Sequence, residues 1–163
     1  MKDIILIATI KDWNINNFYE FKKKFEDKYN LYLITNKDDL IYQNVKELNP
    51  KYIFFPHWSW LIPNEIYENY ECILFHMTDL PYGRGGSPLQ NLITNKIYNT
   101  KISAIKVTKE LDEGDIYLKE NFDISKGSAR EIYENASNLI FSELIPKIIE
   151  NNLIPTKQEG DIV

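Results

Sequence analysis

The chain has 163 residues, of which 44% are hydrophobic and 26% are charged, proportions that fit a soluble globular protein with a buried core. Its formal net charge of -5 argues against a protein that binds nucleic acid by neutralising phosphates, because such binding needs a basic face. The only cysteine, Cys72, excludes an internal disulfide, and no apolar run reaches the length of a membrane span. We therefore expect one cytoplasmic domain over residues 1–163, without a nucleic-acid or membrane partner.

Short apolar runs alternate with amphipathic segments along the chain as far as residue 94. Each apolar run has the length of a buried strand, which predicts strands at 4–8, 31–35, 52–55 and 73–75. The other segments carry apolar residues at helical spacing and predict helices at about 16–27, 38–48, 63–69 and 87–94. This alternation predicts an α/β fold with an open, mostly parallel Rossmann-like sheet and flanking helices.

The rest of the chain predicts a different arrangement. Two strands are expected at 102–108 and 116–122, and the short polar loop between them favours an antiparallel pair. A long C-terminal helix is expected at 128–151, where Pro146 should bend or divide it. The polar residues 154–163 are predicted to form a loose tail.

Residues 72–93 combine the features from which open α/β sheets build a site. A buried strand ends at His76, a glycine-rich loop with Arg84 follows, and a helix is expected to begin at Ser87-Pro88. The other histidine, His57, follows the preceding strand. Because the carboxyl ends of parallel strands meet at one edge of a sheet, we expect both imidazoles in one crevice.

Three common kinds of site lack their sequence signals. A metal site built from the histidines with Asp79, Asp112 or Asp115 would have none of the close His or Cys spacings that zinc ligands show. No Gly-x-Ser-x-Gly elbow indicates a serine nucleophile. The glycines at 83–86 are not followed by the Lys-Ser/Thr pair of a phosphate-binding loop. No metal is therefore expected.

Several short motifs stand in a characteristic order between residues 52 and 122. They are Phe75-His76, Leu80-Pro81, Tyr82-Gly83-Arg84-Gly85, Pro88 and Gln90, followed by Leu111-Asp112-Glu113-Gly114-Asp115. This pattern resembles the catalytic core of the formyltransferases that use 10-formyltetrahydrofolate, which include methionyl-tRNA, glycinamide ribonucleotide and sugar N-formyltransferases. The resemblance implies the formyltransferase fold, folate-dependent N-formyltransferase activity, and 10-formyltetrahydrofolate as the co-substrate.

Formyl transfer requires a donor for the oxyanion of a tetrahedral intermediate and a route for the proton of the attacking amine. The resemblance implies that His76 polarises the formyl oxygen or helps to relay the proton, and that Asp112 accepts the proton and orients the histidine. Leu74 stands where the family has an asparagine, and a leucine cannot bind an oxyanion. His57 is our first candidate to replace that donor, and Asn91 is the second.

The co-substrate is expected to contact the loops beside these catalytic residues. An alternative role for His57 is that it only shapes the folate pocket together with Trp58. Arg84 is predicted either to lie over the substrates or to pair with a carboxylate such as Asp79. The full set of expected cofactor-binding residues is Trp58, Tyr82, Arg84, Gly85, Gly86 and Asp115.

The acceptor is predicted to be the amine of an amino sugar, either nucleotide-linked or a nonulosonic-acid precursor, in surface glycan biosynthesis. The pattern Phe-His-x-x-Asp-Leu-Pro resembles the sugar N-formyltransferases, and both the short chain and its acidic balance disfavour tRNA. Two alternatives stay open, a formyltetrahydrofolate hydrolase and a degenerate domain that binds folate or a sugar without turnover. A homodimer is a further expectation.

Overall fold

The structure, a computed structural model, describes residues 1–160. It has two compact units, which follow one another in the sequence and divide between Leu74 and Phe75. The first unit carries most of the parallel strands, and the second carries the antiparallel pair and the C-terminal helices.

The first unit is built on parallel strands in the order β2-β1-β3-β4. Ile5 of β1 pairs with Leu31 of β2 on one side and with Tyr52 of β3 on the other, and Phe55 pairs with Leu74 of β4. Strands β1 and β3 are almost wholly buried, as expected for continuous apolar runs covered on both faces. The bounds are β1 Asp3–Ala8, β2 Tyr29–Ile34, β3 Tyr52–Phe55 and β4 Cys72–His76.

The helices of the first unit depart from the predicted boundaries in two places. Helix α1 begins at Asp12 and not near residue 16, because Asn14 is buried in its first turn, where its amide donates to Thr9 Oγ1 and the Pro56 carbonyl. The predicted helix at 38–48 is divided, since the Asn36 side chain accepts from Asp38 N and a short 3-10 turn forms first. The bounds are α1 Asp12–Phe25, a 3-10 turn Lys37–Asp39, α2 Tyr42–Leu48 and α3 Asn64–Asn69.

The second unit contains the predicted antiparallel pair, β5 (Asn99–Lys106) and β6 (Ile116–Asp123). Strand β5 begins three residues earlier than its apolar run, because Asn99 and Thr100 pair with Asp123 and Phe122. Helix α4 (Pro88–Thr94) precedes the pair. Ser87 stands at its N-cap position but makes no side-chain cap, because its backbone is left-handed with φ 55°.

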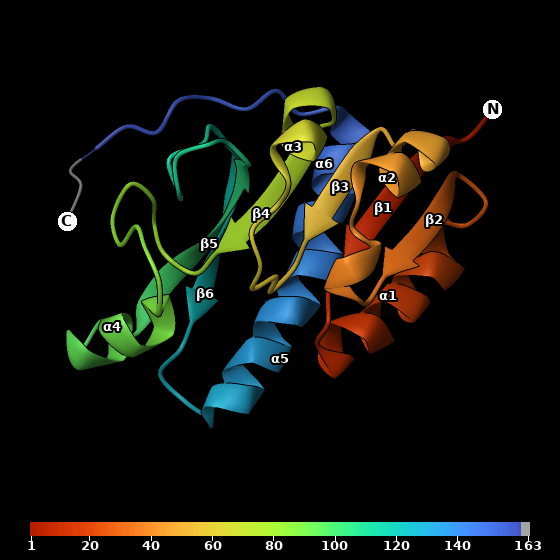
Figure 1. Ribbon diagram of the computed structural model, residues 1–163. Helices are drawn as coiled ribbons and strands as arrows, with labels where there is room; N and C mark the ends of the chain where they lie inside the picture. Colours follow the sequence, from red (N-terminus) through yellow and green to blue (C-terminus); the bar gives the residue numbers. More distant parts are fainter. Residues whose placement is uncertain (161–163) are drawn as a thin grey trace. The chain divides into compact units, whose positions relative to one another are not determined.

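The long C-terminal helix forms as predicted and is interrupted near Pro146. Figure 1 shows it as one continuous run of turns, composed of α5 (Ala129–Leu139), a π-helical turn (Ile140–Leu144) and α6 (Ile145–Asn151). A proline has no N–H for the helix ladder, so the widened turn just before Pro146 accommodates the missing bond. Ser128 and Glu131 form a capping box at the start of α5.

The prediction of a loose tail was wrong for the residues that the structure describes. Thr156 forms a β-bridge with Ile116, in which Ile116 N donates to Thr156 O at 2.7 Å and Thr156 N donates to Ile116 O at 2.8 Å. Residues 161–163 of the predicted tail lie outside the described part. No helix within residues 1–160 is long and apolar enough to cross a membrane. The predicted α/β fold class, with mostly parallel strands and a late antiparallel pair, is confirmed.

Candidate functional site

His76 and Asp112 form a buried pair in the second unit. His76 is the last residue of β4 and is 7% exposed, and Asp112 lies in the loop before β6 and is 6% exposed. Their closest polar atoms, His76 Nδ1 and Asp112 Oδ1, are 3.6 Å apart. The structure thus brings together the two residues that the sequence motifs selected for catalysis.

The other ring nitrogen of His76 fixes the tautomer. His76 Nε2 lies 2.7 Å from the Gly83 carbonyl oxygen, and because a carbonyl can only accept, Nε2 must carry a proton. The other nitrogen, Nδ1, faces the carboxyl group of Asp112. Gly83 can approach so closely because it has φ +71° and lacks a Cβ, which would lie 2.7 Å from Thr78 Cγ2.

The chain beyond His76 is attached to β5 by buried hydroxyl groups. Thr100 Oγ1 donates to the Met77 carbonyl at 3.1 Å, and Ser103 Oγ donates to the Thr78 carbonyl at 2.7 Å. Both hydroxyl residues are buried, so these bonds are shielded from water. These two bonds fix the backbone of Met77 and Thr78, the residues that directly follow His76.

Asp112 is held by the glycine loop and by the shape of its own loop. Gly85 N donates to Asp112 Oδ2 at 2.9 Å, while Asp112 itself has a left-handed backbone with φ 55°. Gly114 allows the loop to turn against β5, because a Cβ at that position would lie 1.7 Å from Lys106 O. The same approach lets Lys106 N donate to Asp115 O at 2.9 Å.

We expect Gly114→Ala to destabilise the protein by about 3 kcal/mol, because the clash is with a backbone oxygen that cannot rotate away. The measurement is the free energy of unfolding from urea denaturation. Gly86→Ala is the matched control, since a Cβ there meets no atom within 4 Å, and it should change stability by less than about 0.5 kcal/mol. Equal effects of the two substitutions would contradict the close approach at Gly114.

Arg84 contacts the second loop and the C-terminal segment. Its guanidinium donates to Gln158 Oε1 through Nε at 3.2 Å and Nη2 at 2.9 Å, and Nη1 donates to Glu113 Oε1 at 3.3 Å. The predicted pairing of Arg84 with a carboxylate is found, but the carboxylate is that of Glu113 and not that of Asp79, which forms an ion pair with Lys119. Arg84 therefore ties its loop to the loop that carries Asp112.

His57 lies in the first unit, directly after β3, in a left-handed conformation with φ 52°. Its Nδ1 accepts from Asn14 Nδ2 at 2.8 Å and from Trp13 Nε1 at 3.4 Å. An indole nitrogen can only donate, so the proton of the neutral ring is on Nε2. Burial, with a smaller contribution from Lys11, lowers the pKa of His57 to about 4. This imidazole is therefore neutral at physiological pH and carries one N–H.

Trp58 follows in the same unit and packs edge-on against Phe55 and Trp60. Its indole Nε1 is buried and has no hydrogen-bond partner among the described residues. A buried donor without a partner is costly and is typical of a group that pairs with a ligand or a water. Trp58 thus fits the predicted role of contacting the co-substrate.

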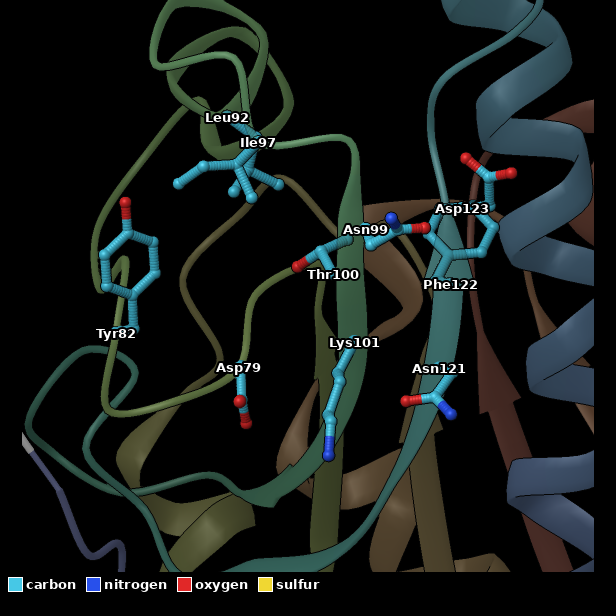
Figure 2. Close-up of a pocket in the computed structure, with 10 residues that line it drawn as sticks. All are labelled: Asp79, Tyr82, Leu92, Ile97, Asn99, Thr100, Lys101, Asn121, Phe122 and Asp123. Carbon is cyan, nitrogen blue, oxygen red and sulfur yellow. The ribbon is translucent and has the colours of Figure 1, made fainter.

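The remaining predicted site residues lie in the second unit. Gly86 and Asp115 are exposed, and Asn91 donates through its amide to the Gly86 carbonyl at 3.3 Å. Tyr82 is half-buried beside a cavity of about 570 Å³. Figure 2 shows the residues that line this cavity, from the loop at 79–82, the α4 region, β5 and β6: Asp79, Tyr82, Leu92, Ile97, Asn99, Thr100, Lys101, Asn121, Phe122 and Asp123.

That cavity does not contain the catalytic pair, since neither His76 nor Asp112 lines it. The cavity and the His76–Asp112 pair are therefore separate features of the second unit. The described residues 1–160 also contain no group of three or more His, Cys, Asp or Glu side chains that could hold a metal ion.

Sequence reasoning missed two polar residues at these sites, Asn14 beside His57 and Gln158 beside Arg84.

Comparisons with known proteins agree on one family. A family model described as formyl transferase matches residues 17–149. A solved structure, methionyl-tRNA formyltransferase from Clostridium thermocellum, is 55% identical with a TM-score of 0.96, and the match covers 99% of this chain and 70% of that one. Methionyl-tRNA formyltransferase of Rickettsia massiliae is 29% identical over 141 residues, which are 84% of this chain and 47% of the relative.

The solved structure of a sugar N-formyltransferase from Shewanella is a more distant match. It is 16% identical with a TM-score of 0.73, and the match covers 98% of this chain and 74% of that one. This likeness shows a shared fold alone. The chain spans less than half the length of the curated relatives that it matches.

The predicted amino-sugar acceptor, with its place in glycan biosynthesis, was wrong. The 55% identical structure and the curated relatives are methionyl-tRNA formyltransferases. The expectation of no nucleic-acid partner is contradicted by the same relatives. It depended on the net charge of -5, which sums the charges of the whole chain and does not describe any single face.

Proposed function

We propose, because the chain belongs to the formyl transferase family, that it transfers a formyl group from 10-formyltetrahydrofolate to the amine of methionyl-tRNA. Family membership supports the predicted enzyme class, a folate-dependent formyltransferase, and the predicted co-substrate. The observation that carries the proposal is the buried His76–Asp112 pair beside the glycine loop.

The reaction requires little more than a positioned base and a stabilised oxyanion. The amine nitrogen attacks the formyl carbon, and the C=O electron pair moves onto the oxygen to give a tetrahedral intermediate. The nitrogen then loses a proton, the bond from the formyl carbon to the folate nitrogen breaks, and that nitrogen gains a proton. A buried carboxylate next to an imidazole suits the proton steps, which typically contribute about two to four orders of magnitude in rate.

The structure favours one of the two roles left open for His76. Its Nε2–H is engaged by the Gly83 carbonyl, and its Nδ1 faces Asp112. We propose that Asp112 accepts the proton of the amine, directly or through water, and that His76 relays it through Nδ1. Polarisation of the formyl oxygen by His76 would require Nε2 to leave Gly83.

The oxyanion donor cannot be the side chain of residue 74, because Leu74 has a hydrocarbon side chain. His57 fits the chemistry of such a donor, since its neutral ring carries the proton on Nε2 and resists protonation. A neutral imidazole donates a hydrogen bond without adding a charge that would hold the amine proton away. We propose this role for His57; Asn91, whose amide donates to Gly86, is the second candidate.

The residues of this chain fit the co-substrate at one observed point, the partnerless Nε1–H of Trp58. We propose that this N–H donates to the folate. Contacts of Tyr82, Arg84, Gly85, Gly86 and Asp115 with the substrates are also part of the proposal. Bound 10-formyltetrahydrofolate supplies the activated formyl group. Gly85 also positions Asp112, because its backbone N–H donates a hydrogen bond to the Asp112 carboxylate.

The acceptor is the part of the proposal that depends on the relatives. The chain covers 70% of the 55% identical methionyl-tRNA formyltransferase.

The family match at 17–149 extends across the boundary between the two units, which supports the prediction of a single catalytic domain. A cytoplasmic location belongs to the same proposal, since aminoacyl-tRNA is found there.

The test is to incubate the purified protein with 10-formyltetrahydrofolate and methionyl-tRNA. We expect N-formylmethionine on the tRNA, measured by mass after release from the tRNA, and an equal amount of tetrahydrofolate, measured by absorbance. Uncharged tRNA and free methionine are the controls. Formate release without formylmethionine would replace the proposal with a hydrolase, and folate binding without any turnover would replace it with a binding domain.

A further inference from the structure

The C-terminal segment, defined as residues 153–160, joins the loop of Asp112 by a fixed register. The bridge between Ile116 and Thr156 is antiparallel, so the residue two positions after Thr156 lies opposite the residue two positions before Ile116. Those residues are Gln158 and Gly114. The bridge therefore delivers the Gln158 side chain to the loop of Asp112.

The amide of Gln158 makes four hydrogen bonds to the two loops of the candidate site. Its Nε2 donates to the Asp112 carbonyl at 2.8 Å and to the Gly114 carbonyl at 2.9 Å. Its Oε1 accepts from Arg84 Nε at 3.2 Å and from Arg84 Nη2 at 2.9 Å. Two N–H donors and two lone pairs are the whole capacity of a glutamine amide, so every hydrogen-bonding position of this group is used.

The glycine loop contacts both members of the His76–Asp112 pair, and the other loop carries one of them. The glycine loop offers the Gly83 carbonyl to His76 Nε2 and the Gly85 N–H to Asp112 Oδ2. The other loop carries Asp112 itself, in the strained left-handed conformation. A shift between the loops would therefore change both the distance from His76 to Asp112 and the direction of the carboxylate.

We propose that Gln158 is a positioning residue, which holds the Arg84 loop against the Asp112 loop and so sets the geometry of the His76–Asp112 pair. It acts through its neighbours and does not touch the reacting atoms. The kinetic meaning of this role rests on the proposed function, but the structural role does not.

The chemistry of the site selects an amide over the other side chains of this size. A glutamate would retain the two acceptors for Arg84, but its second oxygen would face the carbonyls of Asp112 and Gly114, which also accept. A lysine would supply donors for the carbonyls and repel Arg84. Gln158→Glu is therefore a sharper test than truncation, because it keeps size and one half of the bonds.

The first measurement uses the fact that the chain has only two histidines. In protein labelled with ¹⁵N at the imidazole rings, Gln158→Ala and Gln158→Glu should each change the ring nitrogen shifts of His76 and leave those of His57 unchanged. These shifts report the tautomer and the hydrogen bonds of each ring. Lys157→Ala, at the exposed neighbouring position, is the matched control and should change neither ring. Unchanged His76 shifts in both Gln158 variants would overturn the proposal.

The second measurement is the rate of formyl transfer. Gln158→Ala should lower kcat by about ten- to a hundredfold, the usual cost of displacing a catalytic group by about 1 Å, with KM for folate within about twofold. In the Asp112→Asn background the same substitution should have no further effect on kcat. A full additional loss there would show that Gln158 acts elsewhere and overturn the proposal.

The two measurements separate the fate of this proposal from that of the proposed function. If the wild-type protein transfers no formyl group, the function fails, while the His76 shifts still decide whether Gln158 sets the pair. If the wild type is active and Gln158→Ala has wild-type kcat, the positioning role fails and the function stands. Circular dichroism of each variant verifies that the chain is folded.

Discussion

Asp112→Asn should lower kcat for formyl transfer by about two to four orders of magnitude, which is the usual contribution of a positioned general base. The amide has the same shape and can still accept from Gly85 N through its oxygen, so the loop should keep its conformation. It cannot take up the amine proton. The dissociation constant for 10-formyltetrahydrofolate, measured by isothermal titration, should stay within about threefold, because only the transition state requires the base.

The control for this substitution is Glu110→Gln, which removes one negative charge from an exposed position two residues away. It should leave kcat within about twofold of wild type, as expected for a screened surface charge. An Asp112→Asn variant with wild-type kcat would remove Asp112 from the reaction. Loss of folate binding to the same extent as kcat would instead assign Asp112 to binding.

The proximity of His76 and Asp112 could be predicted because its evidence is local in the sequence. His76 ends a continuous apolar run, and such a run forms a buried strand wherever it stands in an α/β sheet. Asp112 lies in a compact Leu-Asp-Glu-Gly-Asp motif whose glycine is required by the close approach to Lys106. Both residues therefore leave a signal that does not depend on distant parts of the chain.

The contact between Arg84 and Gln158 could not be predicted, because it joins residues that lie far apart in the sequence. Arg84 and Gln158 are separated by 74 positions, and no periodicity or composition links them. Polar residues at the end of a chain have the same composition as a disordered tail. Only the bridge from Ile116 to Thr156 distinguishes the two, and a bridge of one residue pair has no sequence pattern.

The acceptor was predicted incorrectly for a related reason. The amine that a formyltransferase acylates is recognised outside the catalytic motifs, so residues such as His76 and Asp112 carry no information about it. The prediction of the acceptor used the net charge of the chain instead, which disfavoured tRNA. The relatives with higher identity point instead to methionyl-tRNA, the acceptor that we propose.

His57 should make the stability of the protein depend on pH in mildly acidic solution. Its pKa is lowered from 6.5 to about 4, so below pH 6.5 the unfolded chain binds a proton that the folded chain does not. The free energy of unfolding should therefore fall as the pH decreases from 6.5 to 4, by about 3 kcal/mol in total from this group. Above pH 7 the group is neutral in both states and adds no pH dependence.

His57→Asn is the variant that isolates this contribution. Asparagine tolerates the left-handed backbone at φ 52°, and it has no proton to gain in this range. The free energy of unfolding is measured by urea denaturation at pH 4.5, 5.5 and 7. The difference between wild type and variant is taken at each pH, so that the contributions of the ionisable groups that both proteins share cancel. We expect that difference to decrease toward acid, because only the wild type loses stability through residue 57. If the free energies of unfolding of wild type and variant change in parallel with pH, the His57 imidazole has the same pKa in the folded and unfolded chain. The folded protein would then not keep His57 neutral, and the argument for His57 as an oxyanion donor would fail.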